Sequence, residues 1–375
     1  MRVALVHDYL TQYGGAERVL EQFHELWPDA PIFTALYDPA ALPPHWQDWD
    51  IRESWLGRIP GARRNHRRLV PLYPLAFRSF GRALGDYDVI LSDTSAWAHQ
   101  ASARGGSLHI AYCHSPARFL WRDDAYLEPA ALPGPVRALA DGVFAVLRGL
   151  DRRSAQRLDT IIANSATVAK RIRAAWGRDS TVIYPPVTGD RFVPPVSEPD
   201  DFYLVVSRLV PHKRIDLAVA AFTTSGRPLR IVGTGPESDR LRLMAGPCVS
   251  MLGALPDSET IALMRRCRAL ILPGREDFGI TAVEAQAAGR PVIAFGEGGA
   301  TESIIDGRTG VLFREQTVAA VNTAVVTAEG MTWSSEACVA NAHRFHATSF
   351  RAKIETTIRA SYDRHVATQA GSTSN

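Results

Sequence analysis

The sequence predicts an α/β protein of two domains, each with a parallel sheet covered by helices on both faces. At 375 residues the chain exceeds what one ordinary hydrophobic core holds. Short, continuous apolar runs alternate with amphipathic stretches, a pattern typical of buried parallel strands joined by helices. The segment 184–201 interrupts this alternation with five prolines, so we interpret it as the linker between the domains.

The apolar runs give the expected strands of each domain. The first half of the chain contains four of them, at 3–9, 88–93, 108–114 and 160–165. The second half contains five, at 202–209, 228–233, 250–253, 269–274 and 291–295. We expect two Rossmann-like domains, 1–190 and 191–345, that face each other across a cleft. A helical pattern predicts a C-terminal helix at 346–366 that returns to the N-terminal domain, followed by a disordered tail at 367–375.

Composition and charge describe a folded chain that does not need a nucleic-acid partner. Hydrophobic residues make up 46% and charged residues 22%, and the net charge is only +3. The four scattered cysteines form no C-x-x-C pair, so we expect reduced thiols in a cytoplasmic protein. The N-terminus lacks a signal-peptide pattern, and the sequence contains no apolar run of about 18 residues.

Residues that follow strands are the candidates for binding, because ligands of such sheets bind at the carboxyl ends of the strands. After the first strand, Gly14 and Gly15 precede a helical pattern. Their backbone N–H groups suit a phosphate, and a simple tight turn is the alternative. Asp8, Asp93 and His114 also end strands. Each of these three side chains could contact a sugar, an acceptor or a reacting group, or have a structural role only.

The second half offers fixed cations and glycines after its strands. Arg208 and Lys213 lie in the loop after the first of these strands. A forked guanidinium and a point charge suit a diphosphate, and an ordinary basic loop is the alternative. Gly233 and Gly235 follow the next strand, where they either leave room for a base or ribose or form a strand-to-helix turn.

Two glutamates eight residues apart flank a predicted helix start. Glu276 lies in the loop before it and suits hydrogen bonds from sugar hydroxyls, whereas Glu284 lies in the helix and suits ribose hydroxyls. The free N–H groups at the helix start, from Gly279 onward, favour an anion. A capping box from Thr281 to Glu284 is the alternative, in which Glu284 only satisfies the helix start.

Metal binding has weak support in the sequence. The two D-x-D triplets, at 48–50 and 86–88, could in principle hold a divalent cation on a diphosphate. One of them lies in a tryptophan-rich loop, and the other precedes its strand and so lies at the wrong end of the sheet. We therefore expect no metal and no other cofactor, with cations and helix N-termini neutralising any phosphate charge.

The segment from Arg58 to Arg82 contains seven arginines and no acidic residue, interleaved with aromatic and aliphatic residues. Such a segment suits an anionic membrane surface or a phosphorylated lipid. An ordinary basic surface and nucleic-acid binding are the alternatives, and the lack of a nucleic-acid motif disfavours the latter. We expect a peripheral protein at the cytoplasmic face of a membrane.

Taken together, these motifs resemble glycosyltransferase family 4, the retaining transferases of the GT-B fold. The likeness covers nearly the whole chain, from the Gly14 loop through Arg208 and Lys213 to the E-x7-E pattern of Glu276 and Glu284. Four stretches look most like the bacterial mannosyltransferases of O-antigen and exopolysaccharide assembly, which typically use GDP-mannose: 7–9, 14–19, 112–116 and 207–217.

The resemblance implies a role for each candidate residue. Arg208 and Lys213 would bind the pyrophosphate, Glu276 the transferred sugar and Glu284 the ribose, while His114 would lie near the sugar and the developing charge. The implied catalytic residues are His114, Arg208, Lys213 and Glu276. The substrate-binding residues that we expect are Gly14, Gly15, Asp8, Asp93, Gly233, Leu252, Leu255, Phe278, Gly279, Ile280, Thr281 and Glu284.

The expected activity is the metal-free transfer of a hexose, with retention, onto a lipid-linked or polysaccharide acceptor. Mannose from GDP-mannose is the leading donor. One alternative keeps the fold but uses UDP-glucose, UDP-galactose or another sugar nucleotide. Another is a sugar-nucleotide-binding protein that has lost catalysis. A nicotinamide-dependent enzyme is disfavoured, because the third glycine of the dinucleotide fingerprint is missing after the first strand of each half.

Overall fold

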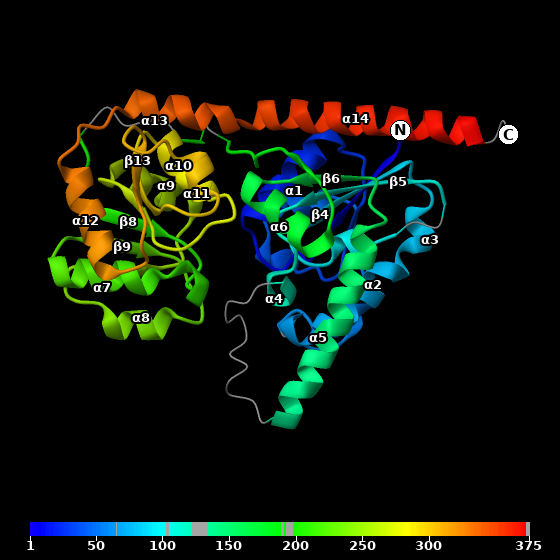
Figure 1. The fold of residues 1–375 in the computed structure, drawn as a ribbon, viewed down its shortest axis with the longest axis horizontal. Coiled ribbons are helices and arrows are strands. Elements are labelled where there is room, and N and C mark those ends of the chain that lie inside the picture. Colours follow the sequence, from blue (N-terminus) through cyan, green and yellow to red (C-terminus); the bar gives the residue numbers. More distant parts are fainter. Residues whose placement is uncertain (65, 103–104, 122–133, 189–190, 193–197, 373–375) are drawn as a thin grey trace. The chain divides into compact units, whose positions relative to one another are not determined.

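The computed structural model describes the chain except for residues 65, 103–104, 122–133, 189–190, 193–197 and 373–375. The chain forms two compact units (Figure 1). Unit 1 comprises Met1–Tyr184 and Phe350–Asn375, and unit 2 comprises Pro185–Ser349. The expected architecture of two parallel-sheet α/β domains is confirmed.

Unit 1 is built on a seven-stranded parallel sheet with the order β3-β2-β1-β4-β5-β6-β7. Its strands are β1 Val3–His7, β2 Ile32–Thr34, β3 Ile51–Glu53, β4 Val89–Thr94, β5 Leu108–Cys113, β6 Thr160–Ala163 and β7 Thr181–Val182. Its α-helices are α1 Gly15–Leu26, α2 Tyr73–Ser79, α3 Gly81–Leu84, α4 Arg118–Trp121, α5 Gly134–Ala155, α6 Ala166–Trp176 and α14 Ala347–Ser372. Short 3₁₀ helices lie at Pro39–Ala41, Pro44–Asp48, Trp55–Arg58, His66–Leu72 and Ala98–Gln100.

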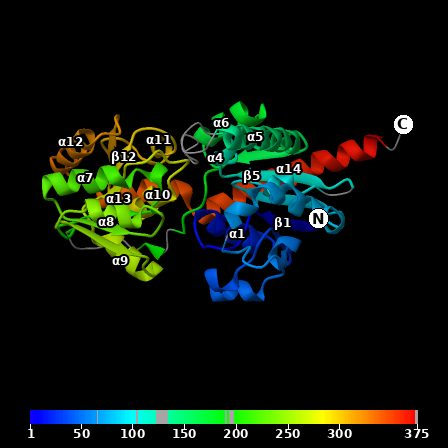
Figure 2. The ribbon, with the colours of Figure 1, turned by 90° about the horizontal axis from the view of Figure 1, so that it is seen from below.

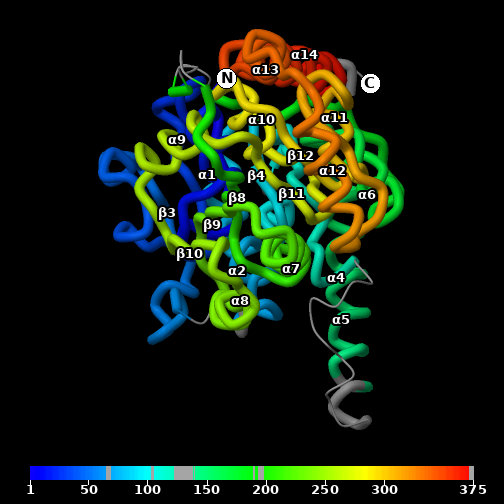
Figure 3. The backbone as a smooth tube through the Cα atoms, turned by 90° about the vertical axis from the view of Figure 1, so that its left-hand side faces the viewer, coloured from blue at the N-terminus to red at the C-terminus, as the bar shows by residue number. Residues whose placement is uncertain are grey.

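Both faces of the unit 1 sheet are covered. On one face, Leu5 and Ile110 pack against α1 and α14, whose Phe23 and Phe350 have ring centroids 5.7 Å apart. The other face packs against α2, α5 and α6, and α5 and α6 lie together in Figure 2. Figures 1 and 3 show that α5 extends well beyond the sheet.

Unit 2 has a six-stranded parallel sheet with the order β10-β9-β8-β11-β12-β13. Its strands are β8 Tyr203–Val206, β9 Leu229–Val232, β10 Val249–Gly253, β11 Leu270–Leu272, β12 Val292–Phe295 and β13 Gly310–Phe313. Its α-helices are α7 Ile215–Ser225, α8 Ser238–Met244, α9 Asp257–Arg266, α10 Ile280–Ala287, α11 Ala300–Ser303, α12 Val318–Glu329 and α13 Ser335–Ala342. Two 3₁₀ helices lie at Pro211–Lys213 and His343–Phe345.

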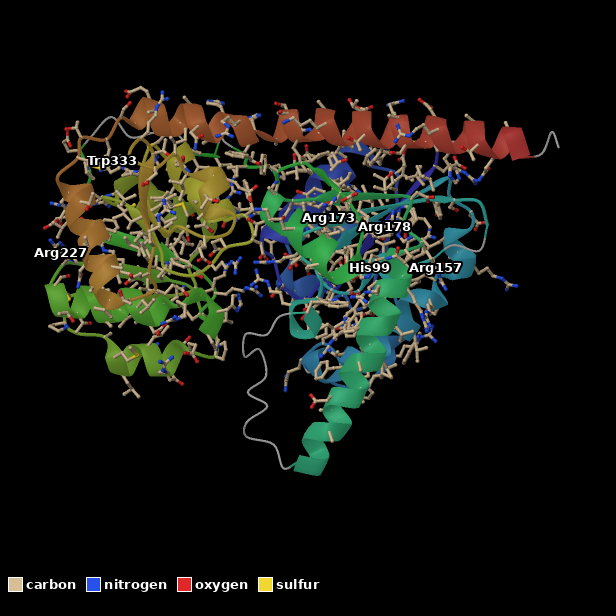
Figure 4. All side chains as sticks on the ribbon, in the orientation of Figure 1. His99, Arg157, Arg173, Arg178, Arg227 and Trp333 are labelled. Carbon is tan, nitrogen blue, oxygen red and sulfur yellow. The ribbon has the colours of Figure 1, made fainter. Side chains whose placement is uncertain are left out.

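The core of unit 2 joins its sheet to α7 and α12. Val205 and Ile271 of the sheet pack against Phe222 of α7 and Val325 of α12. At the far edge of this layer, Arg227, which is labelled in Figure 4, donates to both carboxylate oxygens of Glu329 at 2.8 and 2.7 Å. The carboxylate therefore ties α12 to the loop that leads into β9.

The C-terminal helix differs from the prediction at its end. The segment 367–375 is expected to be a disordered tail, but α14 continues to Ser372, so the prediction is wrong for 367–372; residues 373–375 lie outside the described part. Two contacts hold the last turns: His365 Nε2 and Gln369 Nε2 both bond the carbonyl oxygen of Gly106, at 2.6 and 2.9 Å. The predicted return of this helix to the N-terminal domain is confirmed, because Phe350, Ile354 and Ile358 belong to the unit 1 core.

The predicted strands all occur, and most are shorter than their apolar runs; β4 equals its run in length and β10 is one residue longer. Four further strands, β2, β3, β7 and β13, were not expected from the sequence. They have four residues or fewer. Predicted strands such as β8 and β11 are equally short, so length alone does not explain why these four were not expected. None of the described helices combines the length and the apolar content that crossing a membrane requires.

Candidate functional site

Each sheet has one point where the strand order reverses, and candidate residues gather at both points. In unit 1 the reversal lies between β1 and β4, and in unit 2 it lies between β8 and β11. Open α/β sheets bind ligands outside the carboxyl ends of the strands at such a point. His7 ends β1 and Asp93 is the next-to-last residue of β4, whereas Lys213 and Glu276 lie in the segments that follow β8 and β11.

Strand register brings an ionisable cluster together in unit 1. His7 and Asp93 are direct partners across β1 and β4 and so lie on the same face of the sheet. Tyr112 is the partner of Asp93 on β5, and His114 follows two residues later on that face. His7 Nδ1 donates to Asp93 Oδ2 at 2.9 Å, and His114 Nε2 donates to Asp93 Oδ1 at 2.6 Å. His7 Nε2 lies 3.7 Å from Glu17 Oε1.

The cluster is strongly charged despite its burial. Burial opposes a charge on His7, but the hydrogen bond to Asp93 and the proximity of Glu17 outweigh it and raise the pKa of His7 from 6.5 to about 10. Burial also opposes the charge on Asp93, but His114 and His7 lower its pKa by charge attraction and hydrogen bonding. We infer a buried imidazolium at His7 beside a buried carboxylate at Asp93.

Two of the predicted substrate-binding residues in unit 1 have structural roles instead. The Asp8 carboxylate is buried and accepts five hydrogen bonds: from the backbone N–H groups of residues 95–98 and from the Ser95 hydroxyl, at 2.6–2.9 Å. The prediction that Asp8 orients a sugar is therefore wrong, because its lone pairs are already taken. Asp93 bonds two histidines in the same way, so it orients His114 rather than a ligand.

The glycine loop before α1 is also occupied. Gly14 is the residue before the first turn of α1, and its backbone N–H donates to Glu17 Oε2 at 2.8 Å. Glu17 is 2% exposed, so its carboxylate occupies the site where a phosphate oxygen was expected. The structure thus favours a capped helix start at Gly14; phosphate binding at Gly15 stays a prediction.

In unit 2, two of the predicted catalytic residues contact each other. Lys213 Nζ donates to both oxygens of the Glu276 carboxylate, at 2.8 and 2.6 Å. Their side chains are 18% and 11% exposed, so the pair is mostly shielded but still reaches solvent. Arg208 lies nearby in the sequence on the same loop, is exposed, and has no side-chain hydrogen bond or ion pair within the described residues. Of the two cations predicted to bind a diphosphate, Lys213 is therefore paired with a carboxylate, whereas Arg208 is not paired among the described residues.

Local geometry explains how Lys213 and Glu276 meet. Gly274 comes so close to Lys213 that a Cβ at Gly274 would lie 2.7 Å from the Lys213 carbonyl oxygen. Only glycine permits this approach without a shift of backbone. The carbonyl of Glu276 then accepts the N–H of Gly299 at 2.9 Å, which fixes the loop on its other side. Arg214, directly after Lys213, has φ = 50°, a rare backbone conformation for a side chain of its size.

The glycines after β9 have a packing role. A Cβ at Gly233 would lie 1.9 Å from the carbonyl oxygen of Ser207, and one at Gly235 would lie 2.2 Å from that of Leu209. This packing agrees with the alternative of a strand-to-helix turn, and a role for these glycines beside a base or ribose stays a prediction. The backbone on either side of Arg208 fills the space in which a Cβ would lie. The lack of a side chain at both glycines therefore lets that loop pack against them.

Helix α10 begins earlier than a capping box at Thr281 requires. Its first residue is Ile280, and Gly279 precedes it with φ = 85° and no side-chain cap. Thr281 is thus already helical, which excludes the capping-box explanation for Glu284. Glu284 lies in the second turn and is 8% exposed. The buried Gln286 amide bonds the carbonyl oxygens of Ala282 and Ser303 and so fixes α10 in unit 2.

The other predicted residues of unit 2 vary in exposure. Phe278 is buried, with its ring centroid 5.2 Å from that of Phe345, so its side chain packs in the interior and does not reach a ligand as predicted. Leu252 is exposed, whereas Leu255, Ile280 and Thr281 are half-buried. Roles for these four in donor binding stay predictions.

Sequence reasoning assigned no role to His7 and Glu17. A signal for His7 was present, because a histidine ends the first buried strand, directly before Asp8. Glu17 has the spacing of a capping residue three positions after Gly14, which conceals its contact with His7. Both ring nitrogens of His7 and Nε2 of His114 point at carboxylates. Within the described residues no group of three His, Cys, Asp or Glu is arranged to hold a metal ion.

Two family models match consecutive parts of the chain. "Glycosyltransferase Family 4" matches residues 13–191, and "Glycosyl transferases group 1" matches residues 188–344. Together they contain β4 of the unit 1 switch point and both strands of the unit 2 switch point, whereas β1 precedes the first match. The first match contains His114, and the second contains Arg208, Lys213, Glu276 and Glu284.

Curated relatives resemble part of the chain. A glycogen synthase of Mycobacterium tuberculosis is 33% identical over 206 residues, which cover 50% of this chain and 49% of the relative. A GDP-mannose-dependent alpha-(1-6)-phosphatidylinositol monomannoside mannosyltransferase of the same organism is 30% identical over 241 residues, 54% of this chain and 63% of the relative. The chain thus spans about half to just under two thirds of these relatives.

Solved structures share the fold over almost the whole chain. Anabaena HepE in complex with UDP and glucose has a TM-score of 0.70 and 21% identity, and covers 96% of this chain and 99% of its own. Sucrose-phosphate synthase of Thermosynechococcus elongatus has a TM-score of 0.72 and 18% identity, and covers 97% of this chain and 100% of its own.

Proposed function

The chain belongs to the GT-B glycosyltransferases of group 1 and family 4, and from this premise we propose that it transfers a hexose from a nucleotide sugar to a hydroxyl acceptor with retention. The observation that carries the proposal is the site of unit 2. There, Lys213 and Glu276 lie 2.6–2.8 Å apart, Glu276 in the loop before α10 and Lys213 in the segment after β8. The segment after β8 also contains Arg208, whose side chain has no partner among the described residues.

Each group of this site has a task in the proposed reaction. Arg208 offers a forked donor to the diphosphate and Lys213 a point charge. The N–H groups at the start of α10 add a partial positive charge. Glu276 accepts hydrogen bonds from hydroxyls of the transferred sugar, and Glu284 accepts them from the ribose. This division of tasks explains why one cation is paired with a carboxylate and the other is not.

The chemistry that we propose is attack by the acceptor hydroxyl on the same face of the sugar from which the leaving group departs. The acceptor oxygen forms a bond to the anomeric carbon while the bond from that carbon to the phosphate oxygen breaks. The acceptor's proton passes to the departing phosphate oxygen, so the products are the glycoside and a nucleoside diphosphate. Arg208, Lys213 and the α10 N-terminus stabilise the charge on the departing diphosphate, and no metal takes part.

GDP-mannose is the donor that we propose first. The motif resemblance and the name of the mycobacterial mannosyltransferase support it. The glycogen synthase and the UDP-bound Anabaena structure favour the alternative of a UDP-sugar. A thermal-shift panel of GDP, UDP and ADP with their sugar conjugates separates the two, because the correct nucleotide raises the melting temperature most.

Turnover decides between an enzyme and a binding protein. We expect release of GDP from GDP-mannose, with EDTA present, when a lipid-linked glycan is supplied. Arg208→Ala and Lys213→Ala should abolish most of this release, and Arg242→Ala, on the exposed face of α8, is the matched control. Nucleotide binding without turnover of any donor in a broad acceptor screen would contradict the proposal and leave a sugar-nucleotide-binding protein.

A membrane-borne acceptor is the partner that we propose. The residues around the basic segment expose two large apolar side chains, Trp55 at 37% and Leu75 at 55%. Four exposed arginines lie in the same segment without a side-chain partner among the described residues: Arg58, Arg64, Arg78 and Arg82. Arg63 is different, because it pairs with Glu53 at 2.9 Å. Exposed arginines and apolar side chains that alternate along one segment suit the headgroup region of an anionic bilayer.

Vesicle flotation tests this partner. The wild type should bind vesicles that contain phosphatidylglycerol, and binding should fall as salt is raised. Serine at all four unpaired arginines should release the protein. The matched control places serine at four exposed arginines of unit 2: Arg240, Arg242, Arg308 and Arg314. Equal release by both variants, or binding that ignores salt, would remove this partner and leave an ordinary basic surface.

A further inference from the structure

Unit 1 arranges four ionisable side chains in one line, and only the last of them is appreciably exposed. Glu17 lies 3.7 Å from His7, His7 lies 2.9 Å from Asp93, and Asp93 lies 2.6 Å from His114. The exposed fractions of the side chains are 3% for Glu17 and His7, 0% for Asp93 and 12% for His114. The contacts therefore connect the buried side chains to His114, the one side chain of the four that is appreciably exposed.

Stability alone explains this line poorly. Burying charged groups is costly, and apolar replacements of buried ion clusters are often neutral or stabilising. The same sheet contains buried apolar residues such as Val6 and Leu91 directly beside His7 and Asp93. The charged line instead lies where the strand order reverses, which is the place where such sheets bind ligands.

We propose that His7 is a positioning residue: it holds Asp93 so that Asp93 fixes the ring of His114 through Nε2 and leaves Nδ1 as the atom offered to a substrate hydroxyl. An ionised carboxylate only accepts hydrogen bonds, so both histidines must donate to Asp93. His114 then carries its lone pair on Nδ1. The inference rests on the proposed function for the identity of the hydroxyl, which belongs to the sugar or the acceptor.

The surroundings of His7 make this role possible. The groups that face the pair of His7 and Asp93 are Glu17 from α1, and Tyr112 and His114 from β5 and the residue after it. The Tyr112 hydroxyl donates to the carbonyl oxygen of Ile183 at 3.0 Å, so it does not compete for Asp93. Glu17 secures the far nitrogen of His7. In each remaining hydrogen bond between a histidine and Asp93, the histidine is therefore the donor.

Nitrogen NMR of histidine-labelled protein tests the line without any substrate. At a pH of about 8, His7 should have both ring nitrogens protonated, because its pKa is raised to about 10. His114 should have a protonated Nε2 and a bare Nδ1. In His7→Gln the preference of His114 for this tautomer should weaken. An unchanged His114 spectrum in that variant would overturn the proposal.

Kinetics test whether the line matters for turnover. His7→Gln should lower kcat on the order of 10- to 100-fold, as expected for a displaced reactive group, with the donor KM nearly unchanged. The acid limb of its pH profile should move to higher pH, because Asp93 then directs its whole negative charge at His114 and favours protonation of Nδ1. A purely structural loss would lower activity equally at all pH values.

Two further variants keep the test decisive. His99→Gln is the matched control, because His99 (labelled in Figure 4) is a buried histidine of the same unit that lies 3.0 Å from Asp151. It should leave the pH profile unchanged. Glu17→Gln removes only the outer contact and should shift the profile in the same direction as His7→Gln, but less, and it serves if His7→Gln does not fold.

The possible failures are distinguishable. If the wild type turns over no nucleotide sugar but the NMR pattern is as expected, the proposed function fails and the line stands as a structural fact. If the wild type is active and His7→Gln keeps its kcat and pH profile, the positioning role is overturned. A profile shift in His99→Gln equal to that in His7→Gln would also overturn it.

Discussion

The sites of the two units differ in how their charged side chains are paired. In unit 1, Asp93 is shared by two histidines and its side chain is fully buried, so every charge has a fixed partner. In unit 2, Lys213 and Glu276 form one partly exposed pair, while Arg208 has no partner among the described residues. The difference indicates that the first site is set before any ligand arrives. In the second site, the charge of Arg208 is available to an anionic ligand.

The largest expected effect is on the stability of the closed cluster. Asp93→Asn leaves the imidazolium of His7 buried beside Glu17 alone, and breaking a buried ion pair in this way costs about 3–5 kcal/mol. Urea denaturation at neutral pH measures the loss. A loss of unfolding free energy below about 1 kcal/mol, the usual value of an exposed ion pair, would show that the unit 1 cluster contributes no more than an exposed pair does.

The open site should show its largest effect in catalysis. Lys213→Ala should lower kcat/KM for the donor about 100- to 1000-fold, in the range for loss of one charged donor to a leaving group. It also leaves the Glu276 carboxylate without its partner. Steady-state nucleotide release measures the effect, and a loss smaller than tenfold would contradict the role of Lys213 in binding the diphosphate.

The pH dependence of stability should differ between the clusters. The pKa of His7 is raised in the folded chain from 6.5 to about 10. The stability that this shift contributes is therefore fully present below pH 6.5 and is lost as the pH rises through about 10. The lowered pKa of Asp93 acts at the other end, because its contribution is lost as the pH falls through its folded value.

Paired denaturation experiments measure this dependence. The difference in unfolding free energy between the wild type and His7→Gln should be largest near pH 6.5 and should shrink towards pH 10. Arg208→Ala serves as the reference from unit 2, and its difference from the wild type should not vary over this range. A His7→Gln difference that is constant with pH would show that His7 is neutral.

The smallest expected effect is on stability at Arg208. Arg208→Ala removes an exposed side chain without a partner in the described structure, so the unfolding free energy should change by less than about 0.5 kcal/mol. Nucleotide affinity should nevertheless fall about tenfold, because the diphosphate loses a charged donor. Thermal denaturation with and without nucleotide measures both quantities. A destabilised free protein would mean that Arg208 has a structural role.

The sequence predicted the fold, and which residues of unit 2 lie close together, better than the chemistry of unit 1. Apolar runs located nine of the strands, but β2 and β13, with three and four residues, were not recognised. Glu276 and Lys213 were found because they follow strands, and such residues converge at one edge of a parallel sheet. That they contact each other depends on Gly274, whose close approach to Lys213 only coordinates reveal.

Asp8 and His7 show the limit of this reasoning. Both end the same strand and are ionisable, so sequence position ranks them equally. The alternation of a strand sends them to opposite faces. Asp8 then meets the N–H groups of residues 95–98, whereas His7 meets Asp93. Only the tertiary contacts decide which of two neighbouring residues has a structural role and which belongs to a site.

Calorimetric titration of GDP into the wild type and into Arg208→Ala/Lys213→Ala tests the central claim most directly. The account predicts that the wild type binds the nucleotide and that the double variant, folded as judged by its unchanged circular dichroism, does not. UDP in place of GDP, run with the same two proteins, identifies the base and keeps the test valid for either donor. Equal binding of the tighter nucleotide by the wild type and the double variant would contradict the account.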